Sequence, residues 1–348
     1  MKMLVTGAAG FIGSTFIREA LNEGHYICML DSMSYAGHYE NISEALDSAY
    51  FKKNLSFTKG SINNFELCFS LLSENCLDSI VNFAAETHVD NSIKGPKQFI
   101  EANINGTFSL LEATRKYLNS QSIDFQKKFR FLHVSTDEVF GSLGDSGKFN
   151  ESTSYKPNSP YSATKAASDH LVRAWYHTYN LPTIITNCSN NYGPRQFPEK
   201  LIPLIIKNAL AGKVLPIYGT GKNIRDWIHV EDHSRGILLA LTKGEIGESY
   251  CFGGNSERTN LEVVNSICKI MDELNPLTNS KSYSELISFV EDRAGHDWRY
   301  AIDDSLAVNK LGFNRRYTNF EIGLKQTVQW YLNNQSWVTA VLAKKNNS

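Results

Sequence analysis

Apolar runs alternate with helical periodicity over the first 188 residues of the chain. Ile12, Phe16 and Ala20 recur at the spacing of one helix face, and Gly24 follows as a helix-ending glycine. A second helical pattern covers residues 98–118. Strands that alternate with helices predict parallel βαβ units, and therefore an α/β fold with a doubly wound parallel sheet. The runs predicted as strands are residues 3–5, 26–30, 55–58, 79–83, 129–134 and 183–187.

The pattern becomes less regular after residue 188. Helices are predicted at 201–210, 261–274 and 322–332, and short strands near 215–218, 250–252 and 288–290. No low-complexity linker separates the two parts, so we expect two joined domains with a binding crevice between them. The expected domains are a larger one at 1–188, joined by part of 226–254, and a smaller C-terminal α/β domain at 189–348.

The amino-acid composition limits the classes of function that are expected of the chain. The chain has 348 residues, 42% of them hydrophobic and 20% charged, with a net charge of −1. Without a basic excess, neither a nucleic-acid nor a membrane surface is expected, and acidic ligands need local Arg and Lys. No apolar stretch is long enough for a signal peptide or a membrane span. Six scattered cysteines without Cys-x-x-Cys spacing predict reduced thiols in a cytoplasmic protein and no metal site: Cys28, Cys68, Cys76, Cys188, Cys251 and Cys268.

A glycine motif joins the first strand to the first helix. Gly7, Gly10 and Gly13 are spaced at i, i+3 and i+6, which allows a tight turn, close approach of a pyrophosphate and close helix packing. Asp31 ends the next strand, where a carboxylate accepts from ribose hydroxyls and repels a 2′-phosphate. Residues 82–85 supply small side chains at a later strand end. We therefore predict a Rossmann domain that binds NAD rather than NADP.

Tyr161 and Lys165 lie four residues apart, on one face of a helix predicted to begin after Ser159 and Pro160. An ammonium beside the phenol can favour its ionised form. A free tyrosine has a pKa of about 10, so ionisation near neutral pH needs a shift of about 3 units, or roughly 4 kcal/mol. The positive nicotinamide can contribute to this shift. An exposed Tyr/Lys pair on a helix is the alternative, but the pair follows a dinucleotide motif and predicts an oxidation base.

Asp137 and Glu138 directly follow the predicted strand 129–134. Adjacent acids are commonly solvated loop residues, yet here they enter the same crevice as Tyr161. Two carboxyl groups in opposite protonation states can remove a carbon-bound proton and protonate a departing hydroxyl. This β-elimination becomes feasible once a neighbouring carbon is a ketone, and Thr136 can donate to the developing oxyanion.

Taken together, these residues resemble the nucleotide-sugar 4,6-dehydratases of the extended short-chain dehydrogenase/reductase superfamily. The resemblance runs from about residue 3 to 337, and the Thr-Asp-Glu run distinguishes it from epimerases and decarboxylases. Its motifs stand at 31–37, 84–90, 134–141, 159–165, 187–194, 197–203, 224–232 and 292–297.

The resemblance implies a lyase with retained NAD. Tyr161 and Lys165 would drive oxidation at sugar C4, Glu138 would remove the C5 proton and Asp137 would protonate the C6 hydroxyl, with Thr136 orienting the C4 oxygen. The implied cofactor contacts are Gly7, Gly10, Phe11, Ile12, Gly13, Asp31, Ser32, Ser34, Ser61, Ile62, Phe83, Ala84, Ala85, Tyr161, Lys165 and Asn191. The implied substrate contacts are Thr87, Thr136, Asn190, Lys200, Leu201, Pro216, Tyr218, Arg225, Asn260, Arg293 and His296.

The implied substrate is a nucleoside-diphosphate hexose, with dTDP-glucose expected and UDP-glucose as the closest alternative. Departures from the family pattern at Ser61, Asn91, Phe140 and Arg195 leave the nucleotide open. A same-fold epimerase or decarboxylase would have no use for the acid pair, and a non-catalytic NAD-binding protein would be expected to lose the Tyr/Lys pair. The resemblance also implies a homodimer, through 98–118 and the Tyr161 helix, and a product used for rhamnose or related deoxysugars.

Overall fold

The computed structural model describes residues 1–278 and 281–345, and its centre is a seven-stranded sheet. Every strand pair is parallel, in the order β10-β6-β5-β4-β1-β2-β3. This sheet confirms the predicted doubly wound α/β fold. Its strands are β1 (Lys2–Thr6), β2 (Tyr26–Asp31), β3 (Leu55–Lys59), β4 (Ser79–Asn82), β5 (Arg130–Thr136), β6 (Thr183–Cys188) and β10 (Ser249–Phe252).

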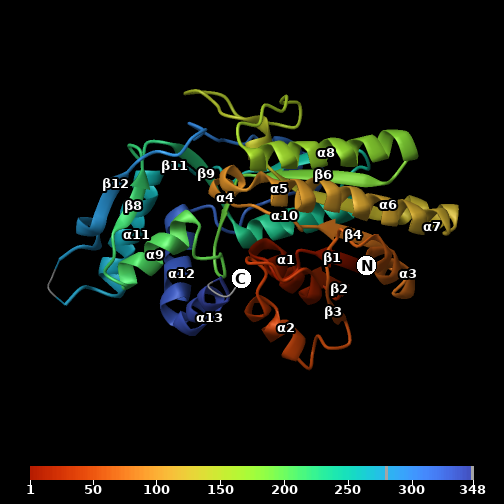
Figure 1. Cartoon of the computed structure of the whole chain (residues 1–348), viewed down its shortest axis with the longest axis horizontal. Helices are drawn as coiled ribbons and strands as arrows, with labels where there is room; N and C mark the ends of the chain where they lie inside the picture. Colours follow the sequence, from red (N-terminus) through yellow and green to blue (C-terminus); the bar gives the residue numbers. More distant parts are fainter. Residues whose placement is uncertain (279–280, 346–348) are drawn as a thin grey trace.

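Helices cover both faces of the sheet (Figure 1). α1 (Phe11–Asn22) and α10 (Val230–Lys243) pack together on one face, with the buried apolar cluster that includes Phe16 and Ile237. The other face carries α3 (Phe65–Glu74), α6 (Gly106–Asn119) and α8 (Pro160–Tyr179), with Leu72 and Leu110 in their core. Shorter helices are α2 (Ser43–Asp47), α4 (Val89–Lys94), α5 (Pro96–Phe99) and α7 (Ile123–Lys128).

The helix α8 begins as its sequence predicts. Ser159 is the N-cap and shares a capping box with Ser162, while Pro160 occupies the first turn. Asn180 ends the helix in the left-handed conformation, with φ +57°. These signals fix the start of the helix, and therefore the direction in which its first two turns present Tyr161 and Lys165.

The long helix predicted at 98–118 differs in one respect. A wide π-helical turn, Ile100–Asn105, joins α5 to α6. The side-chain amide of Asn103 donates to the Glu86 carbonyl at 3.1 Å and to the Thr164 hydroxyl at 2.9 Å, and its oxygen accepts from the Glu86 amide at 2.8 Å. The wide turn points Asn103 inward, and the Asn103 side chain therefore connects the loop after β4 to α8.

The remaining elements surround a second apolar cluster, which includes Ile205 and Val264. β9 (Ile224–His229) pairs with β7 (Asn190–Tyr192) and β11 (Glu257–Thr259), and β8 (Leu215–Tyr218) pairs with β12 (Ile287–Val290). The division into domains at residue 188 stays a prediction, and residues 346–348 of the second lie outside the described residues. The helices are α9 (Leu201–Leu210), α11 (Asn260–Leu274), α12 (Phe320–Asn333) and α13 (Gln335–Lys345).

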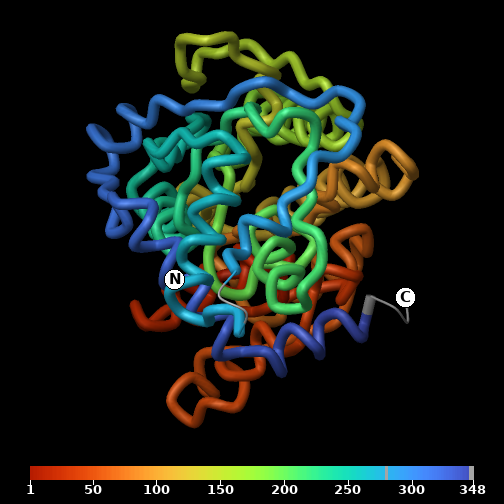
Figure 2. The backbone as a smooth tube through the Cα atoms, turned by 90° about the vertical axis from the view of Figure 1, so that its left-hand side faces the viewer, coloured from red at the N-terminus to blue at the C-terminus, as the bar shows by residue number. Residues whose placement is uncertain are grey.

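The C-terminal helix returns to the first part of the chain. Figure 2 shows α13 passing beside the segment that follows β2, and the indole of Trp337 donates to the Asn41 side chain at 3.0 Å. Among the described residues, no helix combines the length and apolar character that a membrane crossing needs. The strand order changes direction between β1 and β4, so a crevice is expected at their carboxyl ends.

Candidate active site

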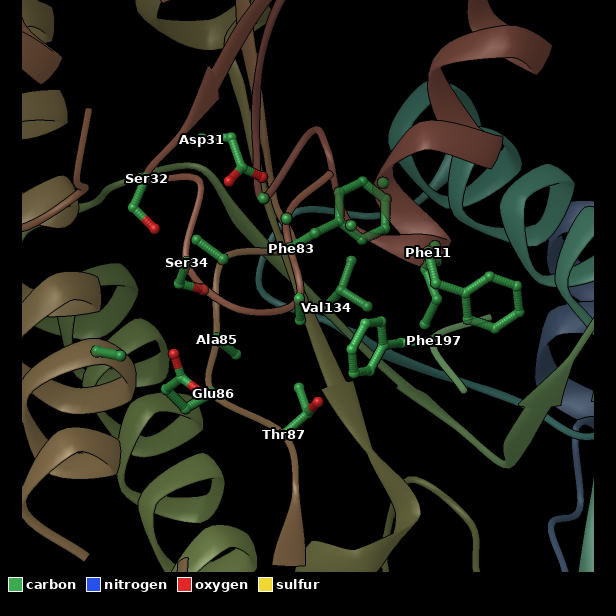
Figure 3. A pocket seen from close by; sticks show the side chains of 18 of the residues that line it. Phe11, Asp31, Ser32, Ser34, Phe83, Ala85, Glu86, Thr87, Val134 and Phe197 are labelled. Carbon is green, nitrogen blue, oxygen red and sulfur yellow. The ribbon is translucent and has the colours of Figure 1, made fainter. Parts of the chain in front are cut away.

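A cavity of about 1080 Å³ opens at the carboxyl ends of β1, β2, β4, β5 and β6. Figure 3 shows Asp31, Ser32 and Ser34 along one part of its wall, and Glu86 and Thr87 further along it. All the residues expected to contact the cofactor line this cavity, and so do Thr87, Thr136, Asn190 and Lys200 of the expected substrate set. The fold therefore collects residues that are widely separated in sequence.

The glycine loop has no room for side chains at two positions. Gly7 has φ +62°, and a Cβ there would lie 2.8 Å from the Ala84 amide nitrogen. A Cβ on Gly13 would lie 2.3 Å from the Gly7 carbonyl oxygen. Gly10 is the N-cap of α1, and no side chain of the described residues caps that end. The exposed N–H groups and the positive end of the helix dipole suit a diphosphate.

Asp31 is fixed at the end of β2 by backbone donors. Its Oδ2 accepts from the Ala9 amide at 2.9 Å and its Oδ1 from the Met33 amide at 2.7 Å. Burial raises the pKa of this carboxyl, and both hydrogen bonds oppose the rise. Each oxygen keeps a lone pair for a further donor. Asp31 therefore suits an adenosine ribose, and Asp31 together with the glycine loop suits a dinucleotide.

The acid pair begins where β5 ends. Asp137 and Glu138 form the start of a 3-10 turn, Asp137–Phe140, and the Thr136 hydroxyl caps it by accepting from the Glu138 amide at 3.3 Å. The Asn187 side chain of β6 donates to the Thr136 carbonyl at 3.1 Å. Asp137 is buried, and its Oδ2 has no hydrogen-bond partner within the described chain.

Burial and then the Glu138 charge raise the pKa of Asp137 well above its ordinary range. Burial also raises the pKa of Glu138, but the charges of Lys200, Arg293 and Arg225 oppose that rise. The environment therefore favours the protonated form most strongly at Asp137, whereas the cations beside Glu138 favour its carboxylate form. Neighbouring acids with different environments are the arrangement that general acid–base catalysis needs.

Tyr161 and Lys165 both line the cavity, but their surroundings differ from the expectation. Burial, and next the Glu138 charge, raise the pKa of Tyr161 well above its ordinary value. The Lys165 ammonium donates to the Val134 carbonyl at 2.9 Å and lies 3.2 Å from His133 Nε2. The expected lowering of the tyrosine pKa is thus not produced by the protein residues of this structure alone.

Part of the expected substrate set lies outside the cavity lining. Arg225 donates to the Asp297 carbonyl at 3.0 Å and stacks on the Tyr300 ring at 4.3 Å. Arg293 lies 3.6 Å from Asp90. These guanidinium groups influence the carboxyl of Glu138 electrostatically. The other expected residues outside the lining are Leu201, Pro216, Tyr218, Asn260 and His296.

Several cavity residues were not predicted as site residues. Tyr35, Glu86 and Glu199 line the wall, and each belongs to a motif already noticed for its neighbours. Arg195, one of the departures from the family pattern, also lines it, with its guanidinium 2.9 Å from Glu44. Burial raises the pKa of Glu86 and, strongly, that of the Tyr35 phenol. Tyr35, Glu86 and Glu199 could have been predicted, because each stands within a motif that was noticed for its neighbours.

The chain is similar to known nucleotide-sugar enzymes over nearly its whole length. A dTDP-glucose 4,6-dehydratase of Xanthomonas campestris pv. campestris is 53% identical over 339 residues, 97% of this chain and 95% of that protein. The crystal structure of the Streptomyces venezuelae dTDP-glucose 4,6-dehydratase with NAD and TYD bound has a TM-score of 0.87 and 41% identity, covering 98% of this chain and 100% of that one.

The fold alone is shared more widely. The UDP-glucose 4-epimerase structure from Thermotoga maritima has a TM-score of 0.83 and 26% identity, over 96% of this chain and 100% of that one. The sequence model of the family described as GDP-mannose 4,6 dehydratase matches residues 4–327. The chain therefore belongs to this family of nucleotide-sugar 4,6-dehydratases.

Proposed function

We propose that this protein is a dTDP-glucose 4,6-dehydratase, which converts dTDP-glucose to dTDP-4-keto-6-deoxyglucose and water. The observation that carries the proposal is the Asp137–Glu138 pair on the cavity that Tyr161 and Lys165 also line. The fold is shared with epimerases, so it cannot decide the reaction. The acid pair has a use in dehydration and none in epimerisation, and the dehydratase relatives at about half identity favour the same reading.

NAD fits the glycine loop and Asp31, and when bound it supplies the reversible two-electron chemistry at the sugar. Tyr161 accepts the proton of the C4 hydroxyl, and the Lys165 ammonium favours the phenolate. Because burial, and next the Glu138 charge, raise the pKa of Tyr161, the positive charges beside it must offset that effect for the base to act near neutral pH. The Val134 carbonyl holds the ammonium in place for this purpose.

The elimination step uses the two carboxyl groups in different forms. Once C4 is a ketone, the C5–H bond is acidified and Glu138 removes this proton. Asp137, held protonated by burial, donates its proton to the C6 hydroxyl as water leaves. Thr136 donates to the oxygen at C4, where negative charge develops. The hydride taken from C4 would be returned to C6 by the bound cofactor, and Glu138 returns its proton to C5, which completes the 6-deoxy product.

We assign the diphosphate and hexose to the part of the cavity beyond the acid pair. Lys200 lies at that end, where its ammonium donates to the Thr87 carbonyl at 2.9 Å. Its charge favours the carboxylate form of Glu138. Asn190 presents a buried side-chain oxygen with no partner among the described residues, which suits a sugar hydroxyl. Arg225 and Arg293 contribute positive charge from the neighbouring wall, and the remaining expected substrate contacts are assigned to the nucleotide.

The test incubates the purified protein, without added NAD, with dTDP-glucose and UDP-glucose separately, and follows loss of one water by mass spectrometry. We expect water loss with retained cofactor, faster with dTDP-glucose. Faster reaction of UDP-glucose would replace the proposed nucleotide. Absence of water loss from both, even with NAD added, would overturn the proposal.

We further propose a homodimer, formed by the face of α6 and α8. These helices contact each other, and Ile100, Phe108 and Tyr179 leave exposed apolar surface along them, at 45%, 47% and 47%. Such a concentration of large apolar side chains suits a second copy. Sedimentation of wild type and Phe108→Glu tests the dimer.

All six cysteines are free, in keeping with a reducing cytoplasm. The keto-deoxysugar product suits a pathway to rhamnose or a related sugar.

A further inference from the structure

A buried polar cluster adjoins Lys165 but does not line the cavity. Its members are His133 on β5 and Ser168 and Asp169 on α8, each exposed by no more than 1%. His133 Nε2 lies 3.2 Å from the Ser168 hydroxyl and 3.4 Å from Asp169 Oδ1. Buried charged and titratable groups are costly unless they serve each other or a function. The proposed reaction steps leave His133 and Asp169 without a catalytic role.

The cluster accounts for the direction of the Lys165 ammonium. An ammonium has three N–H donors. One meets the Val134 carbonyl at 2.9 Å, and the ammonium nitrogen lies 3.2 Å from His133 Nε2. His133 Nδ1 faces the side-chain amide nitrogen of Asn82 at 3.0 Å, so the ring proton is on Nε2, 3.4 Å from Asp169 Oδ1. The other ammonium donors are left for the cavity, which Lys165 lines.

Asp169 provides a negative charge where Lys165 is buried. Its Oδ2 accepts from the Ser135 hydroxyl at 2.7 Å and from the Tyr155 hydroxyl at 3.0 Å. These two hydrogen bonds fix the position of the carboxylate. Its Oδ1 has no hydrogen-bond partner among the described residues and faces His133. The carboxylate is thus fixed at the side of the cluster that Lys165 shares.

The electrostatic directions agree with this geometry. Burial lowers the pKa of Lys165, and the Asp169 charge opposes that change. Burial, and next the Lys165 charge, lower the pKa of His133 to about 4, so its ring is neutral at physiological pH. From β6, the Cys188 thiol also faces Lys165, and burial raises its pKa far enough to keep it neutral.

We propose that His133 and Asp169 are positioning residues that keep the Lys165 ammonium charged and directed at the cavity during C4 oxidation. This inference rests on the proposed function, because it concerns the same oxidation step. Asp169 supplies the counter-charge, and the His133 N–H holds this carboxylate on the side of the cluster that Lys165 shares. Neither touches substrate or cofactor.

The sign of the pH effect follows. Oxidation requires Lys165 in its charged form, so activity is lost as pH rises through the pKa of Lys165. Replacing Asp169 by Asn removes the opposing charge and lowers that pKa further. The alkaline limb of the pH–rate profile should therefore move to lower pH, by about one unit or more.

The experiment records kcat for water loss, and NADH formation, against pH for wild type, Asp169→Asn and Asp169→Glu. We expect the downward shift in Asp169→Asn and its recovery in Asp169→Glu, which keeps the charge. Asp232→Asn is the matched control: Asp232 is equally buried but accepts from the Arg316 and Tyr317 amides instead. Unchanged profiles for Asp169→Asn, with wild-type kcat, would overturn the inference.

A second pair of variants keeps the test decisive if Asp169→Asn does not fold. His133→Gln retains an N–H donor for Asp169, whereas His133→Leu does not. We expect NADH formation to fall about tenfold in His133→Leu and to recover in His133→Gln, the size of roughly one lost charge-assisted hydrogen bond. Equal rates in both would contradict the proposal. A wild-type protein that removes no water would instead overturn the proposed function, so it is measured first.

Discussion

The two acidic residues after β5 occupy different electrostatic environments, and this difference predicts how their variants should fail. Glu138→Gln removes the base for C5 but leaves Tyr161 and Lys165 in place. We expect NADH to accumulate with substrate while water loss falls by on the order of 10²-fold or more. NADH absorbance and mass spectrometry measure the two signals separately. Equal loss of both in a folded variant would count against Glu138 as the base.

The pH response of Asp137 follows from its raised pKa. It must be protonated to donate to the leaving hydroxyl, and burial, then the Glu138 charge, favour the protonated form by raising its pKa. Dehydration should therefore persist above the ordinary carboxyl range and decline as pH rises through the raised value. In Asp137→Asn this limb should disappear, leaving only the loss of oxidation at the pKa of Lys165, with a rate loss on the order of 10²-fold. A persistent limb in a variant that still turns over would assign it to another group.

At this scale the sequence predicted which residues line the cavity better than it predicted their environments. The five expected catalytic residues stand at a strand end or share a helix face, and both are local patterns. The cations that act on Glu138 come from α9, β9 and the segment after β12, so their effect depends on tertiary structure. The same holds for the partners of Lys165, since strand β5 and helix α8 meet only in the fold.

Among the elements, the start of α1 is the one most constrained by backbone packing. We expect Gly13→Ala to weaken NAD binding strongly, because its Cβ would meet the Gly7 carbonyl at 2.3 Å. Such a clash forces the loop and the helix apart. Gly144→Ala is the matched control, since its Cβ would meet nothing within 4 Å. Calorimetric titration of NAD into cofactor-stripped protein measures the difference, and equal affinities would refute it.

Regular elements were predictable where one pattern dominated. The runs at 201–210 and 215–218 coincide with α9 and β8, because each has a clear period and a clear end. The π-helical turn before α6 was not predictable, since it depends on bonds from Asn103 to Glu86 and Thr164. The helix α10 was also missed, although its apolar face packs on α1. Sequence neighbours do not report such long-range partners.

At the scale of the whole molecule, the C-terminal helix α13 returns to the cofactor loop in the first part of the chain. The indole N–H of Trp337 donates to Asn41 Oδ1 at 3.0 Å, and the Asn41 amide donates to the Ala9 carbonyl at 2.9 Å. The Lys344 ammonium donates to the Ser34 carbonyl at 3.1 Å. The C-terminal helix is thus joined by hydrogen bonds to the glycine loop and to the segment after Asp31.

These hydrogen bonds between the C-terminal helix and the cofactor loop predict that the helix slows release of NAD. Trp337→Phe keeps the ring but removes one buried hydrogen bond, worth about 1 kcal/mol, so NAD should dissociate about fivefold faster. Stopped-flow displacement of NAD measures the rate. Trp175→Phe is the matched control, because its indole also loses a single hydrogen bond, to Glu112 at 2.8 Å, on the opposite part of the molecule. Identical dissociation rates in both variants would show that α13 packs against the cofactor loop without slowing NAD release. An increase in Trp337→Phe alone would show that the contact of α13 with this loop retains the cofactor.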